Sequence, residues 1–180
     1  MLRILTPHRP IGIMPSSVPG NHPRRGFWHW SAGGYTQDFA DYTYTILGDS
    51  RATVHQHYSE LNIPQYATWH ENSDSVDIAL LCMADGRLGG DWPLPPLALQ
   101  VERACYLAAE ISHRWRFPIE SWLTHCEIAT RDGYGPDSGD PNLRWDLIST
   151  TQKEQGLRNG GDVMRRKARW YADKYFPGTP

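Results

Sequence analysis

The segment SVDIALLCM, residues 75–83, constrains the fold more than any other part of the chain. It is apolar almost throughout, whereas a strand with one face in water alternates apolar and polar side chains. A short run of this kind is typical of a central strand that is covered on both faces. Residues 97–115 then place apolar side chains at three- and four-residue steps, which predicts an amphipathic helix ending before Pro118. We therefore expect a helix packed against a sheet.

Four further segments have the character of strands. In each of them β-branched and aromatic side chains gather in a short stretch bounded by turn-forming residues. The predicted strands are Phe27–Ser31, Tyr42–Leu47, Arg51–His57 and Trp122–Cys126, with a hairpin turn at 48–50. Strict alternation would put Tyr42 and Tyr44 on the same face. A long loop is expected over 127–144 and a basic helix over 162–175. Strands interleaved with helices predict an α/β fold, a central mixed β-sheet flanked by helices.

The length of 180 residues predicts one compact domain with a substantial core. Residues 1–24 hold five of the 14 prolines and little periodicity, which indicates an irregular N-terminal arm. Residues 25–150 form the main body, and we expect residues 151–180 to be a basic helical extension of the same domain.

Composition excludes several classes of protein. A formal net charge of −2 gives no reason to expect nucleic acid or an anionic membrane as a partner. No stretch approaches the roughly 20 apolar residues of a membrane helix, and the start lacks the apolar core of a secretion signal. We therefore expect synthesis in the cytoplasm. Three cysteines without a CxxC motif argue against a disulfide framework and against a zinc knuckle.

Two histidines and an aspartate are the candidate metal ligands. His29 lies inside an apolar strand, and His125 ends another strand just before a polar loop. Taken singly, such histidines are more often satisfied core or turn residues, and Asp140 in SGDPN is more often a turn residue. Together, two imidazoles and a carboxylate form a known catalytic zinc set with one position left open. Asp132 and Asp137 are rivals of Asp140 in the same loop.

Five segments of the chain occur in the order of a known family. They are FWHWSAG, YTYTILGDS, TWHENSDSVDIALLC, LTHCEIA and SGDPNLRWDL, spread over residues 25–147. In these segments the chain resembles the zinc-dependent N-acetylmuramoyl-L-alanine amidases, whose superfamily includes phage lysozyme-amidases and peptidoglycan recognition proteins. The resemblance implies a mixed sheet packed by helices, a Zn²⁺ cofactor and peptidoglycan or a muropeptide as substrate.

The resemblance also implies roles for particular residues. His29, His125 and Asp140 fall on the three metal-ligand positions, and Tyr42 falls on a catalytic tyrosine. Residues of the tract TWHEN fall on the substrate-facing loop; they are Trp69, His70 and Asn72.

Three features depart from the family pattern. The usual glutamate of the central strand is Ala79, and the usual lysine two residues before the third ligand is Ser138. Asp140 also follows His125 by 15 residues, a longer gap than expected. Tyr42 is therefore the first choice for the second catalytic role, with Glu127 as the alternative.

The leading hypothesis is hydrolysis of the amide between N-acetylmuramic acid and L-alanine. A phage endolysin, reaching the cell wall after release from the cytoplasm, and a cytoplasmic muropeptide-recycling amidase both fit. A peptidoglycan-binding module of the same fold and a different zinc hydrolase stay open as alternatives. The oligomeric state is open, with a monomer favoured.

Overall fold

The computed structural model describes residues 22–61 and 67–180. Residues 1–21 of the expected N-terminal arm lie outside this part of the chain, as do residues 62–66. Across the described ranges, no helix combines the length and the apolar character needed to cross a membrane.

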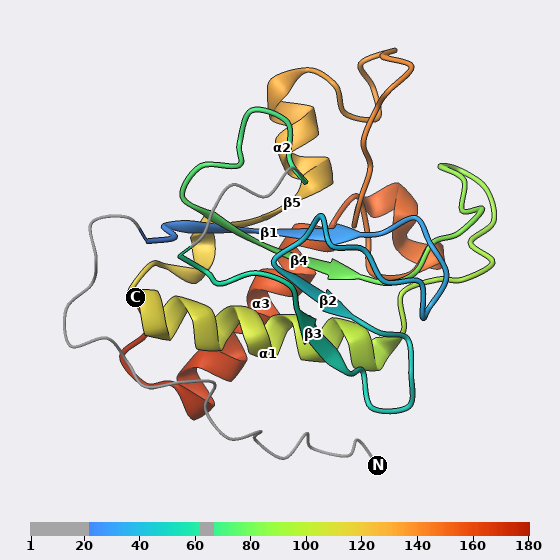
Figure 1. Cartoon of the computed structure of the whole chain (residues 1–180). Helices are drawn as coiled ribbons and strands as arrows, with labels where there is room; N and C mark the ends of the chain where they lie inside the picture. The colour runs from blue at the N-terminus through green and yellow to red at the C-terminus, as the bar shows by residue number, and fades with distance from the viewer. Residues whose placement is uncertain (1–21, 62–66) are drawn as a thin grey trace.

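Five strands form one mixed sheet in the order β3-β2-β4-β1-β5 (Figure 1). The strands are β1 Arg25–Trp30, β2 Tyr44–Ile46, β3 Val54–Gln56, β4 Ser75–Leu80 and β5 Trp122–Thr124. β1 pairs in parallel with β4 and β5, β2 pairs in parallel with β4, and only β3 runs antiparallel to its neighbour. The mixed sheet and the fully buried central strand β4 are confirmed.

Three α-helices flank the sheet: α1 Ala98–Trp115, α2 His125–Asp132 and α3 Gly160–Tyr175. Two short 3₁₀ helices, Ile119–Ser121 and Gln152–Leu157, lie in the connections. In Figure 1, α1 and α3 lie together below the sheet and α2 lies above it. α3 joins the same hydrophobic core as α1, through residues such as Met164 and Ala168. Helices thus flank the sheet, as predicted, and they lie on both of its sides.

The register of the strands separates an apolar face from a polar one. Trp28, Ile78 and Tyr44 lie side by side in neighbouring strands, in the core that α1 and α3 cover. Because side chains alternate along a strand, the next residues, His29, Ala79 and Thr45, point to the opposite face. The face of the sheet that packs against α1 and α3 is therefore apolar. The other face is free to carry polar chemistry.

Two sequence expectations about local structure are wrong. The first concerns residues 125–132, which form α2 although a strand end and a loop were expected there. The reason is a capping box: the Thr124 hydroxyl accepts from the N–H of Glu127, and the Glu127 carboxylate accepts from the N–H of Thr124. The same box ends β5 at Thr124 and turns His125 into the first residue of a helix.

The second concerns Tyr42 and Tyr44, which do not share a face. β2 begins only at Tyr44, so the alternation that applies within a strand does not reach back to Tyr42. Tyr44 is fully buried and donates a hydrogen bond to Glu60 at 2.6 Å. The ring of Tyr42 instead lies against His29, with 5.2 Å between ring centroids.

Candidate metal centre and adjoining pocket

His29, His125 and Asp146 come together on the polar face of the sheet. Their ligand atoms all lie within 4.8 Å of one another, and within residues 22–61 and 67–180 this is the one such group that could hold a metal ion. The two Nδ1 atoms of His29 and His125 are 3.1 Å apart. Asp146 Oδ2 lies 3.3 Å from His125 Nδ1 and 3.6 Å from His29 Nδ1. Three donors therefore converge on one point, which is the arrangement a tetrahedral metal site with an open position requires.

In both imidazoles Nδ1 faces the point where the three donors converge, and Nε2 contacts a second partner. His29 Nε2 lies 3.1 Å from Asp77 Oδ1, and His125 Nε2 lies 3.5 Å from the hydroxyl of Tyr134. Metal-binding histidines commonly hold their second ring nitrogen in this way. The residues present therefore fit zinc in ligand type, in convergence and in outer partners.

The charges of the site also favour a bound cation. Burial by itself lowers the pKa of His29, but the hydrogen bonds and charges of Asp146 and Asp77 outweigh it and raise the pKa to about 9. Burial raises the pKa of Asp146, yet the neighbouring imidazoles outweigh it and hold the pKa well below its usual range. The fully buried carboxylate of Asp77 and the largely buried carboxylate of Asp146 thus favour a positive charge between them, which either a proton on His29 or a metal ion supplies.

The third acidic residue of the cluster is Asp146, where the sequence led us to expect Asp140. Asp140 lies earlier in the same loop, and its Oδ1 accepts from the N–H of Asn142 at 2.7 Å, as in a turn. Asp146 is held by its neighbours. Trp145 packs against Trp30 at 4.8 Å between centroids, and the carbonyl of Asp146 accepts from the N–H of Cys126 in α2. The candidate set is therefore corrected to include Asp146 in place of Asp140. The rivals Asp132 and Asp137 pair with Arg131 and Arg158 instead.

Tyr42 adjoins this cluster from the connection between β1 and β2. That connection is tied down by Asp38, which accepts hydrogen bonds from Thr45 at 2.6 Å and pairs with His55 at 2.6 Å. Burial raises the pKa of Tyr42 strongly, and the charges of Asp146 and Asp77 raise it further. The phenol therefore stays protonated at neutral pH and can donate a hydrogen bond beside the metal position.

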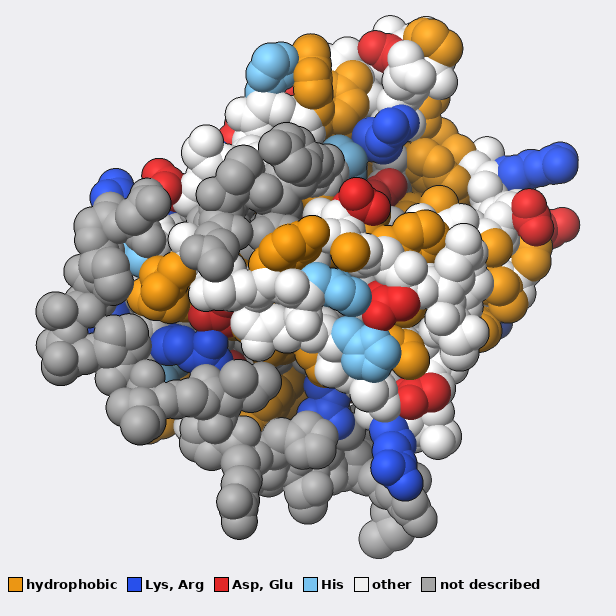
Figure 2. Space-filling view, in the orientation of Figure 1, with side chains coloured by type: hydrophobic (Ala, Val, Ile, Leu, Met, Phe, Trp, Pro, Cys, Tyr) orange, Lys and Arg blue, Asp and Glu red, His pale blue; other side chains and the backbone are white. Residues whose placement is uncertain are grey.

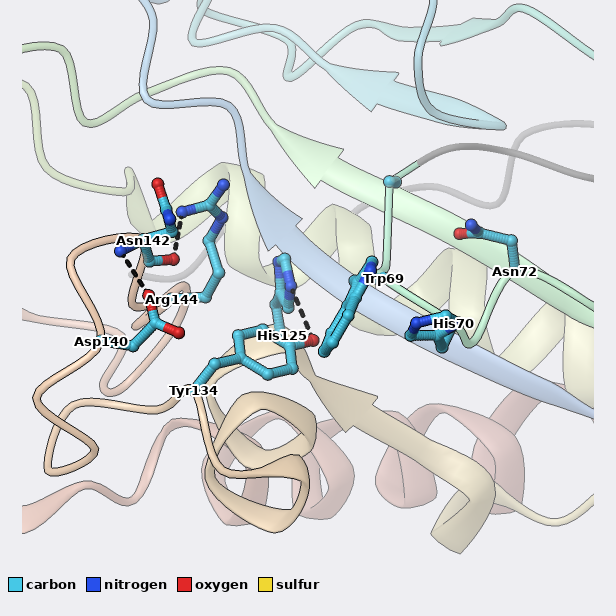
Figure 3. A pocket seen from close by; sticks show the side chains of 9 residues that line it. Trp69, His70, Asn72, His125, Tyr134, Asp140, Asn142 and Arg144 are labelled. Carbon is cyan, nitrogen blue, oxygen red and sulfur yellow. Dashed lines mark hydrogen bonds between the residues drawn. The ribbon is translucent and has the colours of Figure 1, made fainter.

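A pocket of about 480 Å³ opens next to the cluster (Figure 3). It is lined by residues of three segments: Ala67, Trp69, His70, Asn72, His125, Tyr134, Asp140, Asn142 and Arg144. The three residues expected to face substrate, Trp69, His70 and Asn72, thus lie on the same pocket as the ligand candidate His125. Trp69 is 63% exposed and meets Tyr134 edge-on at 5.6 Å between centroids. An exposed indole of this kind offers a flat apolar surface to a ligand.

Arg144 is a cationic residue close in sequence to the candidate ligand Asp146. With Asp146 as the third acidic residue, the position two residues earlier belongs to Arg144 and not to Ser138. Arg144 is exposed, lines the pocket, and its guanidinium bonds the carbonyl of Asn142 at 2.5 Å. A cationic side chain therefore stands two residues before Asp146, at the wall of the pocket.

Glu127 points away from the cluster. Besides capping α2, its carboxylate forms two hydrogen bonds with Arg165 of α3, at 2.7 and 2.8 Å. Every partner that the structure gives this carboxylate is a structural one, at Thr124 or Arg165. Its position indicates that Glu127 fastens α2 to α3.

Replacing Glu127 is accordingly expected to affect stability and not catalysis. Glu127→Ala removes the cap and the pair with Arg165, and should lower the free energy of unfolding by roughly 1–2 kcal/mol. Zinc content and turnover per folded molecule should stay at the parent level. Denaturant unfolding together with metal analysis checks this. Glu120→Ala, which removes a mostly exposed partner of Arg169, is the matched control and should cost much less. A folded Glu127→Ala protein with full zinc and no turnover would restore Glu127 as the proton carrier.

The site residues that were not recognised from the sequence include Asp146, Tyr134, Thr68 and Asp77. Two of them left a signal. Asp146 stands between Trp145 and Leu147 in RWDLI, and Asp77 stands inside the apolar run 75–83. A carboxylate in an apolar segment is largely removed from water, and such a carboxylate needs a partner. Thr68 and Tyr134 have no comparable signal, because their roles depend on how the loops fold back.

No protein-family model matches the sequence, and no curated protein matches it. Among solved structures, the Ph2119 endolysin from Thermus scotoductus MAT2119 bacteriophage Ph2119 is similar with 16% sequence identity and a TM-score of 0.47, over 81% of this chain and 88% of that chain. The N-acetylmuramyl-L-alanine amidase AmiD from E. coli, solved with the substrate anhydro-N-acetylmuramic acid-L-Ala-D-gamma-Glu-L-Lys, is similar with 16% identity and a TM-score of 0.47. That match covers 80% of this chain and 61% of AmiD. Both likenesses concern the course of the backbone and not the side chains of the site.

Proposed function

We propose that this chain is a zinc-dependent amidase that hydrolyses the bond between N-acetylmuramic acid and L-alanine in peptidoglycan. The observation that carries the proposal is the convergence of His29, His125 and Asp146 beside a pocket that also presents the expected substrate-facing loop. The choice of substrate rests on the ordered sequence motifs, which include two of the ligands and that loop and which resemble those of the N-acetylmuramoyl-L-alanine amidases. The third ligand proposed is Asp146.

The roles of the chain's own residues follow from their positions. Zinc, when bound, supplies a Lewis acid for the amide carbonyl and activates water. Tyr42 holds a neutral phenol beside the metal position and donates to the negative charge that develops on the carbonyl oxygen. Arg144 adds a positive charge at the wall of the pocket. Trp69 and His70 offer flat surfaces to the sugar or the stem peptide, and the amide of Asn72 supports their turn by accepting from the N–H of Thr68 at 2.9 Å.

The proposal predicts one zinc ion per chain and hydrolysis that depends on it. Protein purified without added metal should contain close to one equivalent of zinc by elemental analysis. Purified sacculi should then release peptides with free L-alanine amino termini, and chelation should abolish that release. The fold should survive chelation, because the core on the α1 and α3 side of the sheet does not involve the metal. Circular dichroism of the chelated protein checks this.

A metal-free preparation that remains fully active would overturn the zinc mechanism. A non-catalytic binding module remains the second candidate, and the observation in its favour is Ala79 at the position of the usual glutamate. Zinc-loaded protein that binds sacculi without releasing L-alanine termini would support that candidate. Comparing intact sacculi with soluble muropeptides as substrates separates an endolysin from a recycling enzyme.

A further inference from the structure

Asp77 is an unusual residue for the centre of a buried strand. It lies in β4 with no exposed surface, and aspartate is depleted from strands because its side chain neither packs nor pairs well there. Its Oδ1 faces His29 Nε2 at 3.1 Å and the Thr68 hydroxyl at 3.4 Å. Its Oδ2 is buried without a hydrogen-bond partner among the residues that the structure describes. Among the described residues, the hydrogen-bond partners of this buried carboxylate are His29 and Thr68, so both of its contacts lead to the metal cluster or to the turn beside it.

The contact with Asp77 determines which nitrogen His29 offers to a metal. A carboxylate accepts only, so the nitrogen facing it, Nε2, carries the proton. The lone pair of the neutral ring then lies on Nδ1, the atom that faces His125 and Asp146. With the proton on Nδ1 instead, His29 could not act as a ligand in this position. The geometry of the outer contact and that of the ligand cluster therefore require the same tautomer.

Thr68 connects this contact to the pocket. Its hydroxyl lies 3.2 Å from His29 Nε2, and it is fully buried although the next residue, Trp69, is largely exposed. The turn that begins at Thr68 is closed by a hydrogen bond from the N–H of Glu71 to the Thr68 carbonyl. Glu71 in turn pairs with Arg25 of β1 and Arg131 of α2. The base of the substrate-facing turn therefore touches the metal ligand itself.

We propose that Asp77 and Thr68 are positioning residues that fix the ring of His29 with Nδ1 toward the metal, and that Thr68 thereby couples the substrate-facing turn to the metal centre. The proposal rests on the proposed function only in taking the cluster as a zinc site. It also accounts for a strand that lacks the usual glutamate at Ala79 yet keeps a carboxylate on the same face, two residues earlier.

The test measures the metal and the ring, and not hydrolysis alone. Zinc affinity is determined by competition with a chromophoric chelator for the parent, Asp77→Asn and Thr68→Val. Asparagine keeps the shape of the side chain but no longer compels a proton on Nε2, so a loss of 10- to 100-fold in affinity is expected. Thr68→Val removes a neutral partner and should lose less. Thr45→Val is the matched control, because its buried hydroxyl lies on the same face but bonds Asp38 and His57.

The imidazole ¹⁵N spectrum of His29 provides the second readout. In its zinc complex the parent should show a ring that is protonated at Nε2 and bound to the metal through Nδ1, and the fraction of that form should fall in zinc-loaded Asp77→Asn. If Asp77→Asn does not fold, the zinc affinity and the ring spectrum of Thr68→Val are compared with those of the parent instead. Unchanged zinc affinity and an unchanged ring spectrum in the folded variants would overturn the proposal. A parent that binds zinc as described but releases no L-alanine termini overturns the amidase function and leaves the positioning role standing, whereas a parent without zinc affinity overturns both.

Discussion

Asp146→Ala is expected to lose the metal and with it all measurable hydrolysis, whereas Asp140→Ala should keep both. The reason is geometric: Asp146 Oδ2 lies within 3.6 Å of both imidazole Nδ1 atoms, and Asp140 forms a turn further along the pocket wall. Loss of a ligand should weaken zinc binding by more than the 10–100-fold typical of a lost outer partner. Elemental analysis of the purified variants, with turnover on sacculi in the same samples, measures both effects.

The two substitutions are matched, since each removes one carboxylate from the same loop. Asp137→Ala should also keep zinc, because that carboxylate pairs with Arg158 at the surface. Circular dichroism should show that Asp146→Ala retains its helices, so that metal loss is not confused with unfolding. Zinc retained in Asp146→Ala and lost in Asp140→Ala would return the third ligand to the Asp-Pro motif.

Tyr42→Phe should retain zinc and stability but lose on the order of 10²–10³ in kcat, the scale for one oxyanion donor. The phenol is held beside His29, and burial together with the charges of Asp146 and Asp77 keeps its pKa far above neutral. It is therefore a hydrogen-bond donor throughout the working pH range. Because the donor acts on charge that develops during the reaction, KM should change much less than kcat. Steady-state rates with zinc measured in the same sample decide it.

Tyr134→Phe is the matched control for this substitution. Tyr134 is the other phenol of the site, but its hydroxyl contacts His125 Nε2 at 3.5 Å and so supports a ligand. Its loss should lower zinc affinity slightly and kcat less than tenfold. Parent-like activity in Tyr42→Phe, together with an inactive Arg144→Gln that still holds zinc, would transfer the oxyanion role to Arg144.

Local patterns predicted the scaffold because each pattern has a local physical cause. The apolar run at 75–83 predicted a covered strand, and the helical spacing of apolar residues over 97–115 predicted a helix with one buried face. Both predictions are confirmed, by β4 and by α1. The helix α2 also has a local cause, because the capping box THCE at residues 124–127 is itself a sequence signal for a helix start. The β-branched and aromatic pattern of residues 42–47 extends two residues further toward the N-terminus than β2 does, so it does not locate Tyr42 correctly.

The sequence by itself singled out the two histidines that the structure brings together. Each is a polar ring in an apolar strand or at its end, and a known motif surrounds each one. The sequence also determined the loop Trp69–Asn72 as a neighbour of the site. Only the tertiary structure decided the third carboxylate. Between His125 and Asp146 lie a helix and a long loop of turn residues, and short-range preferences there favour Asp140 as readily as Asp146. The choice is made by the packing of Trp145 against Trp30 and by the bond from Cys126 to Asp146. The first contact joins residues 115 positions apart in the sequence and the second joins residues 20 positions apart, so no local pattern encodes either of them.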